Sequence, residues 1–131
     1  MLVFESIHHV SLAVTDIEKA KHFYGELLGF EEIERPPFDF PGAWYQIGKQ
    51  QLHLIVHQDA KTLRRSDSLE TRDGHFGVRV SDYYKTLEFL KSKQIEIEER
   101  PESVSGFAQI FCKDPDHNLI EFNVEQKSLN K

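Results

Sequence analysis

An internal repeat is the feature that most constrains how this chain can fold. Residues 7–14 (IHHVSLAV) return sixty-six positions later, in shortened form, as residues 74–80 (GHFGVRV). The pairs related by this offset are His9 and His75, Val14 and Val80, Asp16 and Asp82, and Phe23 and Phe89. The chain therefore consists of two copies of one structural unit.

Each copy has the pattern of a strand, a helix and three further strands. Alternating apolar residues predict the strands, helical spacing of apolar residues predicts the helices, and Gly29 is a plausible helix stop. The expected strands are 8–14, 30–34, 43–47, 51–56, 74–80, 95–99, 107–112 and 119–124, and the expected helices run from residue 15 or 16 to 29 and from 82 to 93. The predicted fold class is α+β, with two tandem βαβββ modules.

The boundaries of the two modules follow from the charge pattern. We expect a first module at 1–57, a charged linker at 58–73, a second module at 74–124 and a frayed polar tail at 125–131. With 131 residues, the chain suits one compact body that needs neither a metal nor a disulfide for its stability. No apolar run approaches the roughly 20 residues of a membrane helix, and the amino terminus lacks the features of a secretory signal, so we expect a cytoplasmic protein without a membrane partner.

Charge and cysteine content exclude further classes of function. The net charge of -6 argues against a nucleic-acid partner, which requires a basic surface. Cys112 is the single cysteine and lies in an apolar run, so it is expected to be a buried thiol without a catalytic role.

The alternation of side chains along the strands selects four candidate metal ligands. His9 and His75 lie on the faces of their strands opposite the apolar side chains, and so do His53 and Glu121. His53 and Glu121 also occupy equivalent places in the two copies, in Leu-His-Leu and Ile-Glu-Phe. Two equivalent pairs would be related by the pseudo-twofold axis between the copies. One metal ion on that axis could bind all four side chains.

Four stretches of this sequence resemble the glyoxalase, bleomycin-resistance and extradiol-dioxygenase superfamily, also called the vicinal oxygen chelate superfamily. The resemblance extends over residues 8–124 and is carried by residues 7–16 (IHHVSLAVTD), 23–30 (FYGELLGF), 74–80 (GHFGVRV) and 113–122 (KDPDHNLIEF). It implies curled mixed sheets around a cup-shaped metal site. It also implies a homodimer, although the four ligands could come from one chain or from two.

The resemblance places the family's ligands on His9, His53, His75 and Glu121, which would hold one divalent ion (Zn, Ni, Co, Fe or Mn). Glyoxalase I enzymes usually have a carboxylate at the position of His53, and the similar methylmalonyl-CoA epimerases usually have glutamine there. Fosfomycin-inactivating relatives use three protein ligands and leave this position apolar. Histidine therefore distinguishes this chain from each of these groups.

The activity implied is that of a lyase or isomerase acting on a small oxygen-rich substrate or thiol adduct through a metal-stabilised enediolate. By resemblance to glyoxalase I, Glu121 would act as the catalytic base. The alternatives are an extradiol-type dioxygenase, a thiol transferase, or a non-catalytic protein that binds a small toxic molecule. His9, His75 and Glu121 would supply the two histidines and one glutamate of a dioxygenase, but His53 would crowd its open positions.

Two further residues are candidates for binding the substrate. Arg79 lies two residues beyond His75 on the same face and suits a carboxylate or phosphate, although it could instead pair with Glu121. Trp44 is expected at the mouth of the site. Four other histidines are read as structural, with His8 facing the helix; they are His8, His22, His57 and His117.

Overall fold

The computed structural model describes residues 1–130 of the chain, which form two compact units. The first unit comprises Met1–Leu63, and the second begins at Arg64. The boundary lies inside the charged segment 58–73 that was expected to be a linker. The second half of this segment packs on the second unit, because Arg64 donates hydrogen bonds to the His117 carbonyl (2.9 Å) and to the Asp73 carboxylate (2.8 Å).

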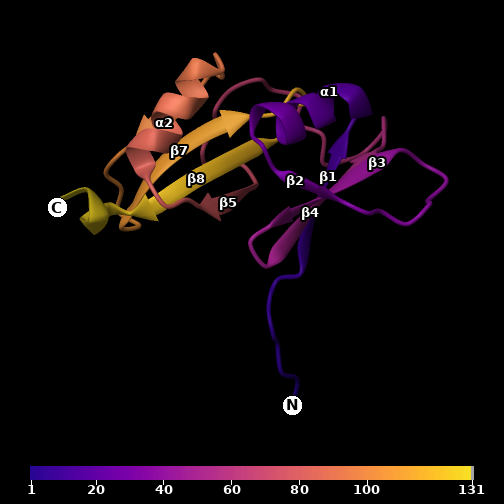
Figure 1. Cartoon of the computed structure of the whole chain (residues 1–131), viewed down its shortest axis with the longest axis horizontal. Coiled ribbons are helices and arrows are strands. Elements are labelled where there is room, and N and C mark those ends of the chain that lie inside the picture. The colour runs from indigo at the N-terminus through magenta and orange to yellow at the C-terminus, as the bar shows by residue number, and fades with distance from the viewer. Residues whose placement is uncertain (131) are drawn as a thin grey trace. The chain divides into compact units, whose positions relative to one another are not determined.

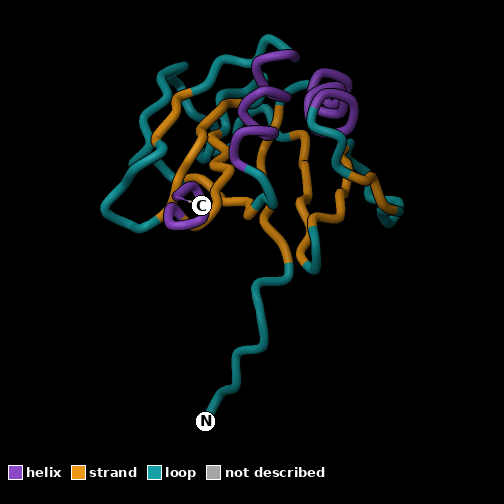
Figure 2. The backbone as a smooth tube through the Cα atoms, turned by 60° about the vertical axis from the view of Figure 1, so that its left-hand side comes forward, coloured by secondary structure: helices purple, strands orange, loops and turns teal. Residues whose placement is uncertain are grey.

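The first unit contains one mixed sheet and one helical segment. Its elements are β1 (His9–Val14), α1 (Ile17–Lys21), η1 (His22–Leu27), β2 (Glu31–Ile33), β3 (Gly42–Ile47) and β4 (Gln50–Val56). The strand order is β1-β4-β3-β2, with β1 parallel to β4 and the other neighbours antiparallel. Residues 1–8 precede β1 as an extended loop (Figure 2), with exposed apolar side chains.

The second unit repeats the same order of elements. Its elements are β5 (His75–Arg79), α2 (Tyr83–Ser92), β6 (Glu98–Arg100), β7 (Phe107–Lys113), β8 (Leu119–Glu125) and η2 (Gln126–Asn130). The strand order β5-β8-β7-β6 corresponds strand for strand to that of the first unit. Figure 1 shows α2 lying along the sheet that contains β7 and β8. The predicted α+β fold with two βαβββ modules is confirmed.

Both helices begin at equivalent aspartates of the repeat. The Asp16 carboxylate accepts hydrogen bonds from the backbone N–H groups of Glu18 and Lys19, and the Asp82 carboxylate accepts one from that of Lys85. These contacts satisfy N–H groups that have no partner within the helix. The first helix changes pitch after Lys21: the Leu28 N–H donates to the Phe23 carbonyl five residues back, at 2.9 Å, in a π-helical turn.

The apolar faces of the two sheets form a separate core in each unit. Val14, Tyr24, Tyr45 and Leu54 are among the fully buried residues of the first unit. Leu90, Ile110, Phe111, Cys112 and Ile120 are among those of the second. The prediction that Cys112 is buried is confirmed. None of the helices in residues 1–130 is both long and apolar enough to cross a membrane.

Three local predictions were wrong. His8 does not face the helix: β1 begins one residue later, and the exposed His8 side chain lies beside His9, with their Nδ1 atoms 2.9 Å apart. The second strand of the second unit, β6, spans Glu98–Arg100, so it begins three residues later and ends one residue later than the expected 95–99. The tail forms the 3-10 helix η2 up to Asn130, so only Lys131 of the predicted frayed segment lies outside the described residues.

Candidate metal-binding and substrate-binding residues

The first unit places His9 and His53 on the same face of its sheet. His53 on β4 pairs in register with Ser11 on β1 and with Trp44 on β3. Its imidazole lies between two rings: the Trp44 ring is 3.9 Å away and inclined by 4°, and the His9 ring is 4.1 Å away and inclined by 14°. His53 is buried, whereas His9 is exposed. The His53 ring is therefore fixed by stacking on both faces.

The environment of His53 favours its neutral form. Burial lowers the pKa of this imidazole to about 4, and the nearby His9 and His8 contribute in the same direction. The Nε2 atom lies 2.8 Å from Gln51 Oε1, a contact that the Nε2–H tautomer makes by donating its proton. In that tautomer Nδ1 carries the lone pair. A neutral imidazole is the form that binds a metal ion, so His53 is ready to act as a ligand at neutral pH.

The second unit brings His75 and Glu121 into direct contact. His75 Nε2 lies 3.0 Å from Glu121 Oε1, and its Nδ1 lies 2.8 Å from the backbone carbonyl of Asp73. Because a carbonyl oxygen only accepts, Nδ1 must carry a proton. Nε2 then faces a carboxylate oxygen, which also only accepts unless it is protonated. The contact therefore requires a second proton or a cation, since two lone pairs would otherwise repel each other.

The residues of the second unit fit a divalent metal ion. His75 Nε2 and Glu121 Oε1 lie 3.0 Å apart, and an imidazole nitrogen and a carboxylate oxygen are groups that could hold one divalent ion together. The hydrogen bond from His75 Nδ1–H to a carbonyl is the usual outer contact of a ligating histidine. Asn123 Nδ2 donates to the other oxygen of Glu121 at 2.8 Å.

The first unit fits an ion only after one ring turns. The His9 and His53 rings are nearly parallel, so the in-plane lone pairs of the two stacked rings cannot both point at one ion. His53 is clamped by Trp44 and Gln51, which leaves the exposed His9 as the ring that turns. Within residues 1–130, no group of three or more His, Cys, Asp or Glu side chains is arranged to hold a metal ion. Each unit supplies one pair of the four predicted ligands.

Arg79 is bonded to an amide and not to the carboxylate of Glu121. Its Nε donates to Asn123 Oδ1 at 2.7 Å, and its guanidinium lies over the ring of Phe107, 5.2 Å from the ring centroid. Arg79 is exposed at the end of β5. Arg79 therefore does not pair directly with Glu121, a possibility that the sequence left open. Asn123 connects the two side chains instead.

Trp44 begins a cluster of aromatic rings that continues into the loop before β3. Phe38 lies 6.3 Å from Trp44 and 5.1 Å from Phe40 by ring centroids. The guanidinium of Arg35 contacts both phenylalanine rings, at 4.9 and 5.1 Å, and donates to the Phe40 carbonyl at 2.8 Å. Phe38 and Phe40 are partly exposed, so this unit presents an aromatic surface next to His53.

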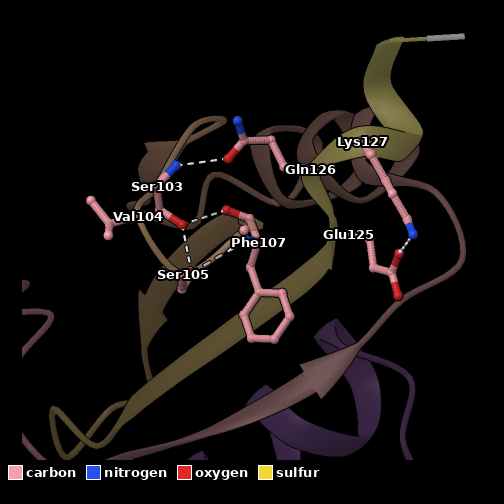
Figure 3. A pocket seen from close by; sticks show the side chains of 8 residues that line it. Ser103, Val104, Ser105, Phe107, Glu125, Gln126 and Lys127 are labelled. Carbon is pink, nitrogen blue, oxygen red and sulfur yellow. Dashed lines mark hydrogen bonds and ion pairs between the residues drawn. The ribbon is translucent and has the colours of Figure 1, made fainter.

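A pocket of about 530 Å³ lies in the second unit, where the loop before β7 meets the end of β8. Figure 3 shows its lining residues, which include Ser103, Ser105, Phe107 and Gln126. The polar groups of the loop bond to one another: Ser103 N–H donates to Gln126 Oε1 at 2.9 Å, and Ser103 Oγ donates to the Phe107 carbonyl at 2.7 Å. None of the four predicted ligands lines this pocket, but Phe107 connects it to Arg79.

Three supporting residues were not predicted from the sequence: Gln51, Gly77 and Asn123. Gln51 and Asn123 bond to His53 and Glu121, respectively. Each lies two residues from its partner, so the same alternation that selected the ligands could have identified both. Gly77 lies opposite Glu121 in the register of β5 and β8, and this position follows from the sheet pairing and not from the sequence.

Comparison with known proteins identifies the family. Residues 6–122 match the model of the Glyoxalase/Bleomycin resistance protein/Dioxygenase superfamily. The chain is 26% identical over 120 residues to a probable lactoylglutathione lyase from Vibrio parahaemolyticus, covering 88% of this chain and 87% of that protein. It is 27% identical over 118 residues to a probable chloroplastic lactoylglutathione lyase from Arabidopsis thaliana, covering 86% of this chain. The chain spans about a third of that relative, 34% of its length.

A solved structure agrees with this assignment. A glyoxalase family protein from Enterococcus faecalis superimposes with a TM-score of 0.71 at 28% identity, covering 92% of this chain and 98% of that one. The family match includes the repeated strands and all four predicted ligands. This chain therefore belongs to the Glyoxalase/Bleomycin resistance protein/Dioxygenase superfamily.

Proposed function

We propose that this protein is a metal-dependent lyase or isomerase of the glyoxalase type, with one divalent ion held by His9, His53, His75 and Glu121. The observation that carries the proposal is the contact between His75 Nε2 and Glu121 Oε1, which requires a proton or a cation. Members of this superfamily generally use a divalent metal ion, and the named relatives include lactoylglutathione lyases. The metal could be Zn, Ni, Co, Fe or Mn.

The proposed chemistry is the removal of a proton from a carbon next to a carbonyl. When bound, the ion would stabilise the negative charge that develops on the substrate oxygens as this proton leaves. Glu121 is the carboxylate of the ligand set and would take the proton as general base. The hydrogen bond from Asn123 Nδ2 holds Glu121 Oε2, so the oxygen facing His75 is the one available to move. The neutral His53 ring would remain a ligand throughout.

Two residues would contact the substrate in this proposal. Arg79 would bind a carboxylate or phosphate group, since its terminal nitrogens are exposed at the end of β5. Trp44 would contact the apolar part, because its ring belongs to the aromatic surface beside His53. We further propose a small-molecule substrate, a homodimer and a cytoplasmic location. Sedimentation at several concentrations would test the dimer.

Metal analysis followed by single alanine substitutions tests the proposed function. The purified protein should hold one divalent ion per chain. Each of His9→Ala, His53→Ala, His75→Ala and Glu121→Ala should lower its affinity at least tenfold, since loss of one ligand contact of about 1.4 kcal/mol has this effect. The matched controls His22→Ala and His57→Ala should retain it. The absence of stoichiometric metal, with no loss in the four variants, would overturn the proposal.

Turnover then distinguishes the reaction classes. The adduct of a 2-oxoaldehyde with glutathione should be isomerised by the metal-loaded protein. Glu121→Gln should lower kcat at least 100-fold, because removal of a general base typically costs 10²–10⁴-fold in rate. Oxygen uptake with a catechol, and no isomerisation of the adduct, would contradict the assignment as a lyase or isomerase and support a dioxygenase.

A further inference from the structure

A directed chain of hydrogen bonds connects Arg79 to Glu121 across two neighbouring strands. Arg79 on β5 lies opposite Asn123 on β8, and Gly77 lies opposite Glu121. Arg79 Nε donates to Asn123 Oδ1 at 2.7 Å, and Asn123 Nδ2 donates to Glu121 Oε2 at 2.8 Å. Asn123 and Glu121 are both buried, with 8% and 6% of their surfaces exposed. Their side chains therefore have few alternative partners in water.

The chemistry of the three groups fixes the direction of this chain. A guanidinium has no acceptor, so the amide of Asn123 must present its oxygen to Arg79. The amide nitrogen then necessarily faces Glu121, and an ionised carboxylate can only accept from it. Turning the amide over would break both bonds. The position of Arg79 thus determines which end of Asn123 meets Glu121.

Gly77 leaves the space that this arrangement requires. A Cβ atom at Gly77 would lie 3.3 Å from Asn123 Nδ2 and 3.8 Å from Glu121 Oε2. A side chain here would press on the hydrogen bond between the two residues. This glycine therefore serves the close approach of side chains from the neighbouring strand.

The far end of Arg79 is open to a ligand. Its Nε is bonded to Asn123, but its terminal nitrogens have no hydrogen-bond partner among residues 1–130. The ring of Phe107 supports the guanidinium from one side. Two parallel N–H groups of a guanidinium match the oxygens of a carboxylate or phosphate.

We propose that Asn123 is a positioning residue that couples the binding of an oxyanion at Arg79 to the orientation of the Glu121 carboxylate. An oxyanion that binds the terminal nitrogens of Arg79 shifts its guanidinium, the Asn123 amide follows because its oxygen is bonded to Nε, and Glu121 Oε2 follows the amide nitrogen. The role of Glu121 as ligand and base rests on the proposed function. The coupling itself is a property of the metal-free protein.

Nuclear magnetic resonance of the metal-free protein tests this coupling at one fixed pH of about 7. Inorganic phosphate is added to the isotopically labelled full chain, and acetate is added in a parallel series to compare a carboxylate. Two signals are followed: the side-chain NH₂ of Asn123, and the imidazole Hε1 of His75, whose Nε2 contacts Glu121. Both signals should shift with the same midpoint anion concentration in at least one of the two series.

Three variants and one matched control separate the steps. Arg79→Met should abolish both movements. Its matched control is Arg100→Met, which removes an arginine of the same sheet that is bonded to Glu98 (2.8 Å) and should leave both movements intact. Asn123→Asp keeps an acceptor for Arg79 but has no donor for Glu121, so the Arg79 Nε–H signal should still respond while His75 no longer does. Asn123→Leu, which adds no charge and has no hydrogen-bonding group, should likewise remove the response of His75 if the aspartate disturbs the fold.

Two results would overturn the proposal. If neither anion moves the signals of the wild-type protein, there is no oxyanion site at Arg79. If His75 responds in both Asn123 variants as it does in the wild type, the anion acts on Glu121 without Asn123. Neither result affects metal content or turnover, so the coupling and the proposed function can fail independently.

Discussion

Three of the four predicted ligands are held by a group two residues away in the chain. His53 bonds to the side chain of Gln51, His75 to the carbonyl of Asp73, and Glu121 to the side chain of Asn123. In an extended strand, residues two apart have their side chains on the same face, about 7 Å apart along the strand. Local sequence therefore supplies supporting contacts for these three ligands before any long-range packing is needed, through side chains at His53 and Glu121 and through the backbone at His75.

The low pKa of His53 makes acid destabilise the metal-free protein. The folded chain keeps this histidine neutral down to a pH of about 4, whereas an unfolded histidine binds a proton near pH 6.5. Between these values the unfolded state holds more protons, so stability is fully present above about pH 6.5 and falls as the pH drops toward 4. The expected loss at pH 5 is roughly 1–2 kcal/mol, since each pKa unit corresponds to about 1.4 kcal/mol.

Urea unfolding at pH 7 and pH 5, in the presence of a chelator, measures this effect. His53→Gln should show a smaller difference between the two pH values than the wild type. His22→Gln, which changes an exposed histidine, should reproduce the wild-type difference. An equal pH dependence in His53→Gln and wild type would contradict the assignment of a low pKa to His53.

Burial should protect the single thiol from reagents. The Cys112 side chain is fully buried, and this burial, together with the nearby Asp114, raises its pKa to about 12. A thiol reagent such as Ellman's reagent should therefore react only after urea unfolds the chain, because the thiolate is the reactive form. Val104→Cys places a second thiol at a fully exposed position and should react immediately in the folded state. Rapid labelling of Cys112 in the folded wild-type protein would contradict a buried thiol with a raised pKa.

Sequence alternation was sufficient to identify the faces of the strands but not all of the contacts. The positions of His9, His53, His75 and Glu121 on the sheet faces follow from alternation alone. The stacking of Trp44 on His53 depends on the register of β3 and β4, and the contact of Arg79 with Asn123 depends on that of β5 and β8. These registers are set by turns and by long-range pairing, which a single sequence does not specify.

The elements themselves were predicted well where the sequence carries local signals. Asp16 and Asp82 mark both helix starts, and the alternating stretches 43–47 and 51–56 form β3 and β4. The π-helical turn at His22–Leu27 was not foreseen, because its apolar spacing resembles that of an α-helix. The short strand β6 was misplaced, since three residues give too little alternation to locate a strand.

The approach of β3 to β4 depends on a glycine at the start of β3. A Cβ atom at Gly42 would lie 2.3 Å from the Leu54 carbonyl and 2.9 Å from Arg35 Nε. Gly42→Ala should therefore lower the free energy of unfolding by about 1–3 kcal/mol, the usual cost of overpacking. Gly74→Ala is the control, since nothing lies within 4 Å of its added Cβ. Thermal unfolding of both variants measures the difference, and equal stability would contradict the close contact.

At the scale of the whole chain, each unit has its own core and supplies two of the four proposed ligands. An ion that binds only when both pairs contribute should stabilise both units together. At a metal concentration of 100 times Kd, the expected stabilisation is about 2.7 kcal/mol. His9→Ala in the first unit and His75→Ala in the second should each remove it from the entire protein.

Calorimetry with and without the metal tests this coupling between units. The wild type should unfold in one transition at higher temperature when the metal is present. The exposed His57→Gln change serves as the control and should leave the increase unchanged. If the metal instead raises the unfolding temperature of one unit alone, either His9→Ala or His75→Ala would leave this increase unchanged. That result would indicate an ion bound by a single pair.

The stacking of Trp44 on His53 has an optical consequence. Trp44 is the only tryptophan in the chain, so its fluorescence arises entirely from an indole whose face lies against this imidazole. Protonated imidazole and paramagnetic ions such as Ni²⁺ and Co²⁺ both quench indole emission at contact distance. The fluorescence of the unmodified protein should therefore decrease as metal binds or as acid protonates His53. His53→Gln should lose the response to acid. The intrinsic fluorescence of Trp44 should therefore report whether the candidate metal site is protonated or occupied.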